Sequence, residues 1–259
     1  KNFGGRLKVL VSGGAPLNTD IGIFFTALGL NLLQGYGQTE SAPVISVNRP
    51  GQVKMETVGT PLLNTDVKIA TDGEILVRGD LLMTGYWNNQ EATKNTIKDG
   101  WLHTGDIGTI DKNNFIEITD RKKDIIVNSG GDNLSPQRVE GFLTLEPEIL
   151  QAMVDGDKKS HIVALIIPDK DFLNEWGEKT GNDANIKTLD EDEFRKEISA
   201  AVERVNNNLS VIEKVRRFHI SFDEFTVENE MITPTLKVRR HKIIEKYHSE
   251  LENLYLNKS

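Results

Sequence analysis

The first part of the chain alternates between strand-like and helix-like spacing of its apolar residues. Residues 7–12 are an apolar, β-prone run that predicts a strand, and residues 31–34 follow as a second predicted strand. Between them, apolar side chains recur at helical spacing, at Ile21, Phe24, Phe25 and Leu28. A strand, a helix and a strand in this order predict parallel pairing of the two strands. Such sheets bind ligands at the carboxyl ends of their strands, which here lead into residues 12–16 and 35–40.

From about residue 58 the pattern changes to short strands separated by turn signals. The Asp72-Gly73 pair stands between two β-prone runs, and residues 112–114 stand between two more. Both patterns predict hairpins. We therefore interpret residues 1–57 as a β-α-β piece and residues 58–119 as a small antiparallel β subdomain.

A charged segment, residues 120–124, separates this region from a second one, and we interpret it as a hinge. Ser135-Pro136 begins a helix beyond it, since a capping hydroxyl is followed by proline at the first turn. The later elements are predicted as a buried strand at 161–168, a helix from Phe194 to Val205, a strand at 217–222 and a helix at 238–256. Residues 125–259 are thus interpreted as a small α+β domain. The predicted fold class is α/β followed by α+β.

Composition narrows the classes of function. The chain has 259 residues and a net charge of −8, which argues against a large nucleic-acid surface. The absence of cysteine excludes disulfides, thiolate metal sites and a cysteine nucleophile. No stretch approaches the roughly 18 consecutive apolar residues of a membrane span, and we expect a cytoplasmic protein. The chain starts without methionine and runs almost directly into a strand, so we expect it to begin inside a longer protein.

One loop combines several chemical groups in a short space. Residues 35–40 bring together two glycines that permit close backbone approach, the ring of Tyr36, the hydroxyl of Thr39 and the carboxylate of Glu40. Taken alone, this segment is more often an ordinary polar turn with a half-buried tyrosine.

Five further motifs favour a functional role for this loop over an ordinary turn. In chain order, the six are Ser12-Gly13-Gly14-Ala15-Pro16, Gly35-Tyr36-Gly37-Gln38-Thr39-Glu40, residues 73–79, Trp101-Leu102-His103-Thr104-Gly105-Asp106, residues 120–131, and Thr233-Pro234-Thr235-Leu236-Lys237. Together they resemble the adenylate-forming (AMP-binding) superfamily, and the branch they are most similar to is the long-chain fatty acid CoA ligases. The resemblance spans nearly the whole chain. It implies the end of the large adenylate-forming domain followed by a small, mobile C-terminal domain.

The resemblance implies a nucleotide site in the first region. Gly14, Ala15 and Pro16 would flank the adenine of ATP, and Tyr36, beside Gly37, would stack on its face. Thr39 would hydrogen-bond the α-phosphate, and Glu40 would help to hold magnesium, which prefers carboxylate oxygen. The alternative for Thr39-Glu40 is a helix cap.

The same resemblance implies that two other residues bind the ribose of the nucleotide. Asp106 would accept both ribose hydroxyls, and Arg121 would reach the same sugar. A turn aspartate is the commoner explanation of Asp106 alone, and a solvated charge run is the commoner explanation of Arg121. We assign Trp101 and His103 to packing and local hydrogen bonding.

The second region carries the remaining implied roles. Lys237 would act with Thr39 and Glu40 in catalysis, because a cation between carboxylate and α-phosphate stabilises the charge that develops when pyrophosphate leaves. Its alternative is a solvated lysine at a helix start. Ser129, Gly130 and Gly131 would admit the pantetheine arm of CoA after a domain rotation about Lys123. A plain β-turn is a compatible explanation of the two glycines.

The sequence departs from the family in three places. Asp120 and Leu236 stand where many members have glycine, and both variants resemble the long-chain branch. No Ser/Thr/Gly-rich loop ending in lysine, which would bind the β- and γ-phosphates, occurs in these residues. We therefore expect the 259 residues alone to turn over no substrate.

The implied function is ATP-dependent ligation of a fatty acid to coenzyme A through an acyl-adenylate. Its small-molecule partners would be the fatty acid, ATP and CoA, with magnesium as the metal and no nucleic acid. One alternative is an acyl-adenylate former with another acceptor, and a second is a catalytically silent nucleotide-binding module. The sequence leaves the acyl chain length, the oligomeric state and peripheral membrane contact open.

Overall fold

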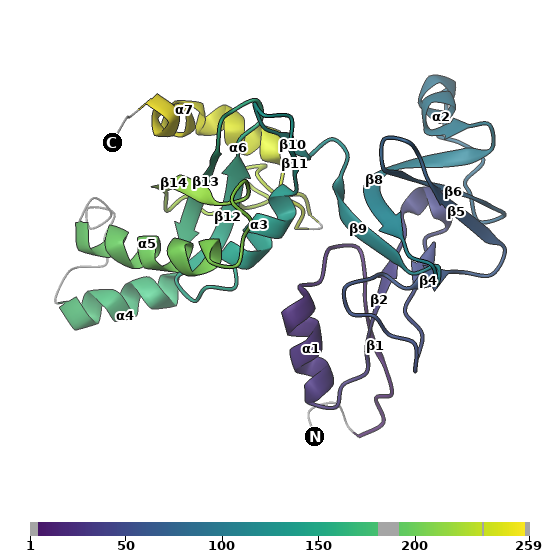
Figure 1. The fold of residues 1–259 in the computed structure, drawn as a ribbon, viewed down its shortest axis with the longest axis horizontal. Coiled ribbons are helices and arrows are strands. Elements are labelled where there is room, and N and C mark those ends of the chain that lie inside the picture. The colour runs from purple at the N-terminus through teal and green to yellow at the C-terminus, as the bar shows by residue number, and fades with distance from the viewer. Residues whose placement is uncertain (1–4, 181–191, 235, 257–259) are drawn as a thin grey trace. The chain divides into compact units, whose positions relative to one another are not determined.

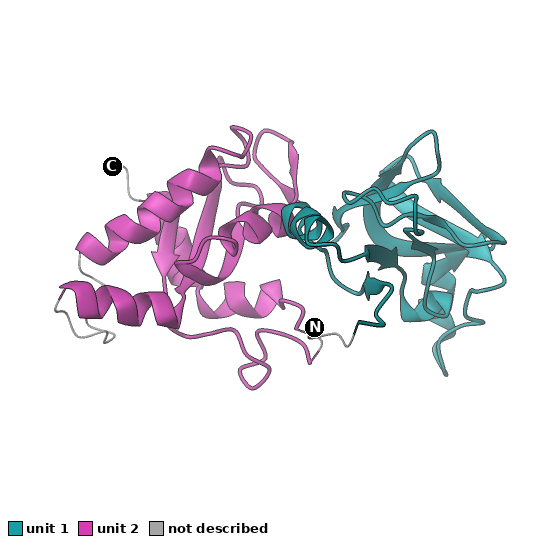
Figure 2. Ribbon diagram, turned by 90° about the horizontal axis from the view of Figure 1, so that it is seen from below, with its two compact units in different colours: residues 1–123 teal, residues 124–259 magenta. Residues whose placement is uncertain are grey.

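The chain forms two compact units, residues 1–123 and residues 124–259, each with its own sheets and its own core (Figure 2). The structure is a computed structural model that describes residues 5–180, 192–234 and 236–256. Both units mix helices and strands, in agreement with the predicted α/β and α+β classes.

The first sheet of unit 1 contains the predicted β-α-β piece. Its four strands lie in the order β1 (Leu10–Ser12), β2 (Leu32–Tyr36), β3 (Ser46–Val47) and β4 (Thr60–Pro61). Strands β1 and β2 are parallel, as predicted, with Ser12 opposite Gln34. The other pairs are antiparallel. The parallel register places the loops that follow β1 and β2 at the same edge of the sheet (Figure 1).

Helix α1 (Thr19–Ala27) connects β1 and β2. Its N-cap is Asn18, whose side chain accepts hydrogen bonds from the amides of Asp20 and Ile21. The helix is confirmed, but its apolar side chains remain exposed in the described chain: Ile21 36 %, Ile23 53 %, Phe24 59 %, Phe25 39 % and Leu28 64 %. The only buried residue of α1 is Gly22, so the helix contributes little to the core of unit 1.

The second sheet of unit 1 is the predicted antiparallel subdomain. Its strands are β5 (Thr65–Ile69), β6 (Glu74–Gly79), β7 (Ile97–Lys98), β8 (Trp101–Ile110) and β9 (Ile116–Arg121), and helix α2 (Gln90–Thr96) precedes β7. The hairpins β5–β6 and β8–β9 are the two that the turn signals predict. In the second, the side chain of Asp111 accepts from the amides of Asn113 and Phe115, which fixes the turn.

Strand β9 continues further than the predicted boundary at residue 119. Asp120 and Arg121 still pair with β8, opposite Ile107 and Asp106. Asp120 is buried, and its side chain accepts a hydrogen bond from the amide of Arg121. The two units divide between Lys123 and Asp124, inside the segment 120–124.

Unit 2 is built around a three-stranded sheet of β12 (Ile149–Asp155), β13 (Ile162–Pro168) and β14 (Val215–Ile220). Every residue of the central strand β13 is buried, because helices cover both of its faces (Figure 1). Helices α3 (Pro136–Leu143), α4 (Lys170–Thr180) and α5 (Asp192–Asn206) contribute to the core on one face. Helices α6 (Arg240–Lys246) and α7 (His248–Leu256) cover the other. A short hairpin, β10 (Ile126–Val127) with β11 (Asn133–Leu134), precedes α3.

The prediction of one continuous helix over residues 238–256 is wrong. The chain forms α6 and α7, which are separated at Tyr247. The hydroxyl of Tyr247 is 2.9 Å from the hydroxyl of Ser221, in the segment after β14. Ile243, Tyr247 and Leu251 nevertheless all face the core, so the apolar spacing identified the correct face.

A buried ion pair joins three elements of unit 2. The guanidinium of Arg240, at the start of α6, donates to both carboxylate oxygens of Glu140 on α3, at 2.7 and 3.0 Å. Arg240 also donates to the carbonyl of Val154 on β12, and the amide of Val154 donates to Glu140 at 2.8 Å. Because Lys237 lies three residues before Arg240, this cluster anchors the chain directly after the lysine loop.

Removing one member of this pair should destabilise unit 2 strongly. Glu140→Ala leaves the Arg240 guanidinium buried without its carboxylate, and we expect a loss of about 3 kcal/mol in the free energy of unfolding. The control is Arg138→Ala on the same helix, whose guanidinium is largely exposed, so that its ion pair with Glu213 should contribute less than about 1 kcal/mol. Urea unfolding with hydrogen exchange of the β12 and β13 peptides measures both. Equal losses in the two variants would contradict a special role for Glu140.

Candidate functional site

The two predicted nucleotide loops meet at one edge of the first sheet. A Cβ atom on Gly13, in the loop after β1, would lie 3.2 Å from the carbonyl oxygen of Gly35 in β2. Gly14, Ala15 and Pro16 follow and are exposed. The structure therefore brings the first motif beside the strand that ends at Tyr36.

The turn after β2 depends on Gly37. A Cβ atom there would lie 1.8 Å from the carbonyl oxygen of Pro43, so no other residue fits this backbone. Gln38 and Ser41 close the turn, since the Gln38 amide donates to the Ser41 hydroxyl and that hydroxyl donates to the Gln38 carbonyl. The short helix η1 (Thr39–Ser41) results.

Thr39 and Glu40 stand on this turn with groups that are free to bind a ligand. Thr39 is exposed, and its hydroxyl has no hydrogen-bond partner among the residues described. The Oε1 atom of Glu40 accepts from the hydroxyl of Tyr86 at 2.8 Å, and within the same residues its Oε2 atom has no partner. A carboxylate with one unoccupied oxygen fits a magnesium ligand, because Mg²⁺ is usually bound by one or two carboxylates together with substrate phosphates.

Asp106 joins the two sheets of unit 1. Its Oδ2 atom accepts from the hydroxyl of Tyr36 at 2.6 Å, and its Oδ1 atom forms an ion pair with Nε of Arg121 at 3.0 Å. Three residues that lie far apart in the sequence are thus brought together from β2, β8 and β9. Burial and the neighbouring Asp106 carboxylate raise the pKa of Tyr36, so its hydroxyl remains a donor.

The burial of this cluster limits what it can offer a ligand. Asp106 is 4 % exposed and Tyr36 is 8 % exposed, and the Tyr36 ring contributes to the hydrophobic core. Both Asp106 oxygens already have a partner, but each carboxylate oxygen has two lone pairs. Stacking by Tyr36 and ribose binding by Asp106 remain predictions.

A second carboxylate supports the backbone beside Asp106. Glu74 of β6 accepts from the amide of Gly105 at 2.9 Å and from Nζ of Lys122 at 3.0 Å, and its Oε2 atom is 3.1 Å from Nδ1 of His103. Trp101 lies against the cations of Lys68 and Arg78. The expectation that Trp101 and His103 serve packing and local hydrogen bonding is confirmed.

Tyr86, which the sequence analysis did not single out, binds Glu40. It lies in the segment between β6 and α2, 46 residues from Glu40. Burial and the hydrogen bond to Glu40 raise the pKa of Tyr86. Nothing in the residue pattern around Tyr86 indicates this contact, since a tyrosine in a polar segment is usually a surface residue.

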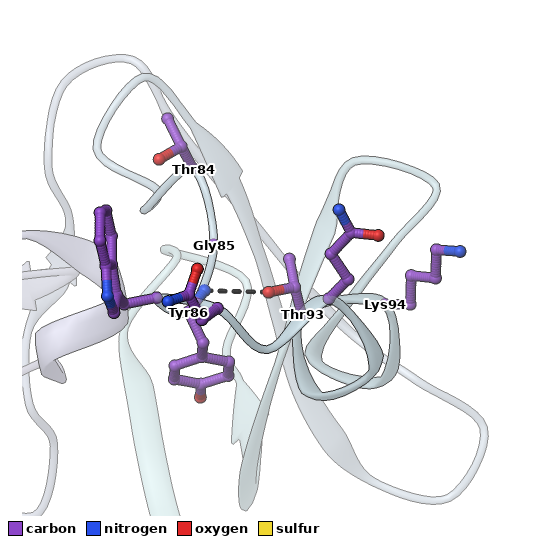
Figure 3. Close-up of a pocket in the computed structure, with 8 residues that line it drawn as sticks. Thr84, Gly85, Tyr86, Thr93 and Lys94 are labelled. Atoms are coloured by element: carbon purple, nitrogen blue, oxygen red, sulfur yellow. Dashed lines mark hydrogen bonds between the residues drawn. The ribbon is translucent and has the colours of Figure 1, made fainter.

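A shallow hollow of about 400 Å³ lies beside this tyrosine (Figure 3). It is lined by Thr84, Gly85, Tyr86, Trp87, Asn88, Gln90, Thr93 and Lys94. None of the predicted site residues lines it, so the hollow is not the predicted nucleotide site.

In unit 2, Lys237 lies on a tight, exposed loop. Thr233 holds the loop, because its amide donates to the carbonyl of Lys237 and its hydroxyl accepts from the amide of Lys237 at 3.0 Å. Leu236 has φ of 60°, a left-handed conformation that favours glycine, the residue that the resemblance leads one to expect there. The ammonium group of Lys237 forms no ion pair with any described residue. Thr235 lies outside the residues that the structure describes.

The predicted CoA-binding segment is a turn organised by Asn128. Its side-chain oxygen accepts from the amides of Gly130 and Asp132, both at 2.9 Å. Gly131 has φ of 87°, a left-handed conformation that favours glycine. Ser129, Gly130 and Gly131 are exposed. The β-turn alternative is therefore correct as a description of the backbone, and it leaves the CoA role untested.

Comparison with known proteins identifies the family. The profile described as "AMP-binding enzyme" matches residues 1–87, and the profile "AMP-binding enzyme C-terminal domain" matches residues 123–259. The chain belongs to the AMP-binding enzyme family. The resemblance drawn from the motifs is thus confirmed.

Relatives within the AMP-binding enzymes include long-chain-fatty-acid–CoA ligases. One from Mycobacterium tuberculosis is 39 % identical over 98 % of this chain and 43 % of the relative. Long-chain-fatty-acid–CoA ligase 6 of Homo sapiens is 32 % identical over 98 % of this chain and 39 % of the relative. The chain thus spans less than half the length of the curated relatives it matches.

Solved structures show the same fold. The adenylation domain of a carboxylate reductase from Mycobacterium chelonae has a TM-score of 0.82 and 23 % identity, over 98 % of this chain and 40 % of that one. O-succinylbenzoate coenzyme A synthetase from Bacillus subtilis, in complex with ATP and magnesium ion, has a TM-score of 0.69 and 24 % identity, over 90 % and 46 %.

No helix among the described residues is both long enough and apolar enough to span a membrane. No group of three or more histidine, cysteine, aspartate or glutamate side chains in the same residues is arranged to hold a metal ion.

The hydrogen bonds to Glu74 predict a pH-dependent contribution to the stability of unit 1. Burial raises the pKa of Glu74, but the bonds from His103, Lys122 and the Gly105 amide outweigh it, so the pKa lies below its ordinary value. The ionised form is therefore stabilising above the unfolded-state pKa, and its contribution is lost as the pH falls through the folded-state pKa.

Glu74→Gln should accordingly be less stable than the wild type at pH 7, and the difference should shrink as the pH falls from about 5 to about 3. Urea unfolding followed through Trp101 fluorescence, in a shared Trp87→Phe/Trp176→Phe background, measures this. Asp66→Asn removes an exposed carboxylate that pairs with Arg78 on the neighbouring strand, and as the loss of a surface ion pair it should lower the free energy of unfolding by less than about 1 kcal/mol. A difference that stays constant with pH would contradict the assignment.

Proposed function

We propose that this chain is part of an enzyme that joins a fatty acid to coenzyme A in two half-reactions. Fatty acid and ATP give an acyl-adenylate and pyrophosphate, and the thiol of CoA then gives acyl-CoA and AMP. One observation carries the proposal: Tyr36 and Arg121 both contact the Asp106 carboxylate. This contact joins three residues from separate strands that are predicted to bind the nucleotide. Membership of the AMP-binding enzymes and similarity to fatty-acid–CoA ligases support it.

In unit 1, the nucleotide would bind at the edge formed by the loops after β1 and β2. Gly14, Ala15 and Pro16 would flank the adenine, which small exposed residues permit. The Thr39 hydroxyl would donate to the α-phosphate. Asp106 would accept the ribose hydroxyls, with Arg121 beside it.

Glu40 would hold magnesium through its Oε2 atom. The metal would spread the charge of the phosphates as pyrophosphate leaves. The fit rests on the donor set, a half-buried carboxylate with one oxygen already fixed by Tyr86 and one without a partner in the described chain.

Lys237 would supply the positive charge for the first half-reaction. An incoming carboxylate and the α-phosphate are both anions, so a cation between them lowers the barrier by stabilising the developing charge. The exposed loop and the absence of an ion pair at Lys237 within the described residues suit a side chain that enters a cleft only during adenylation. A rotation of unit 2 about Lys123 would then bring Ser129, Gly130 and Gly131 to the thiol of CoA.

Lys237→Ala, made in the full reading frame that encodes this chain, tests the proposal. We expect fatty-acid-dependent exchange of pyrophosphate into ATP to fall by on the order of a hundred- to a thousandfold. Conversion of supplied acyl-adenylate and CoA to acyl-CoA should be largely retained, because the lysine charge acts only in the first step. The control is Lys242→Ala in the same basic stretch, residues 237–242. The side chain of Lys242 pairs with Glu245.

Two results would change the conclusion. Equal loss of both half-reactions in Lys237→Ala would make the lysine structural. Pyrophosphate exchange without thioester formation in the wild type would favour an acyl-adenylate former with an acceptor other than CoA.

A further inference from the structure

The carboxylate of Glu40 is held by a residue from a distant segment of the chain. The hydroxyl of Tyr86 donates to Oε1 of Glu40 at 2.8 Å, and Tyr86 lies in the segment between β6 and α2. We propose that Tyr86 is a positioning residue, which fixes the Glu40 carboxylate so that Oε2 faces a nucleotide-bound divalent cation. This inference rests on the proposed role of Glu40.

A backbone contact reinforces the side-chain contact. The amide of Met83, three residues before Tyr86, donates to the carbonyl of Glu40 at 2.9 Å. Segment 83–86 therefore binds both the main chain and the side chain of the same residue. A glutamate on a surface turn has three rotatable side-chain bonds, and the bond from Tyr86 removes much of that freedom, while the bond from Met83 fixes the main chain of the same residue.

Tyr86 is itself held in place from the other side. Its amide donates to the hydroxyl of Thr93 on α2 at 2.9 Å, which is the dashed contact in Figure 3. That hydroxyl donates to the carbonyl of Asn89 at 2.8 Å, and the Asn89 side chain caps α2 through the amide of Ala92 at 3.0 Å. The chain of contacts from α2 through Thr93 and Tyr86 to Glu40 is continuous.

The hydrogen bond from Tyr86 would orient Glu40 toward a cation because a carboxylate has two oxygens that can take different partners. With Oε1 bonded to Tyr86, Oε2 is the oxygen that has no partner among the described residues, and its direction is set by that bond. Carboxylate ligands of metals are commonly held by such hydrogen bonds, and loss of the partner typically lowers metal affinity or activity by about 10- to 100-fold.

The test compares Tyr86→Phe with the wild type in the full reading frame. This change keeps the ring and removes only the hydroxyl. With α,β-methylene-ATP present, Mn²⁺ binding is titrated by electron paramagnetic resonance. We expect the Mn²⁺ dissociation constant to rise about 10- to 100-fold. The Mg²⁺ concentration for half-maximal pyrophosphate exchange should rise similarly, while the rate at saturating Mg²⁺ changes much less.

Trp87→Phe is the matched control. Trp87 follows Tyr86 in the chain, lines the same hollow and is 91 % exposed. It makes no contact with Glu40 in the structure, so Mn²⁺ affinity should be unchanged. Thermal unfolding of both variants identifies any general loss of fold.

Glu40→Gln separates failure of this inference from failure of the proposed function. If Glu40→Gln weakens Mn²⁺ binding and Tyr86→Phe does not, the positioning role is wrong and the metal role of Glu40 stands. If Glu40→Gln also binds Mn²⁺ as the wild type does, the metal role is wrong and the positioning role fails with it. An equal loss of Mn²⁺ affinity in Tyr86→Phe and Trp87→Phe would mean that Tyr86 only packs the loop and does not position Glu40.

Discussion

The buried carboxylate of Asp106 is the constraint on which unit 1 depends. A charge that is 4 % exposed must be compensated, and the compensation comes from the Tyr36 hydroxyl and the Arg121 guanidinium. Tyr36 belongs to the first sheet, whereas Asp106 and Arg121 belong to the second. The same carboxylate therefore ties the two sheets together, fixes the end of β2 and keeps β9 paired almost to the boundary with unit 2.

The polar groups that stabilise the fold have more hydrogen-bond partners than those predicted to take part in catalysis. Glu74, Glu140 and Asp106 each accept from several donors, and their surroundings are fixed. By contrast, the Thr39 hydroxyl and the Lys237 ammonium stand on exposed turns with no side-chain partner among the described residues. Groups of the first kind hold the backbone, and groups of the second kind are those that we propose bind substrate. Glu40 combines both properties, with one oxygen bonded to Tyr86 and one without a partner among the described residues.

Much of the fold could be predicted because its signals are local. Turn residues such as Asp72-Gly73 mark hairpins, and the uniformly apolar run of β13 marks a strand covered on both faces. The break between α6 and α7 could not be predicted, because it occurs at Tyr247, whose hydroxyl meets Ser221 from a segment distant in sequence. The end of β9 was missed because charged residues indicate solvent, while Asp120 and Arg121 have local partners. The contact of Tyr86 with Glu40 is likewise a product of tertiary structure and has no sequence signal.

The backbone at Gly37 has a consequence for how variants of this protein would be classified. The carbonyl of Pro43 fills the space that any side chain at position 37 would need. A substitution there must displace the turn that carries Thr39 and Glu40, so it would remove the proposed activity without altering any group proposed to react. A genetic screen that scores activity alone would count Gly37 among the catalytic positions. A parallel measurement of soluble, folded protein would show instead that the lesion is one of conformation.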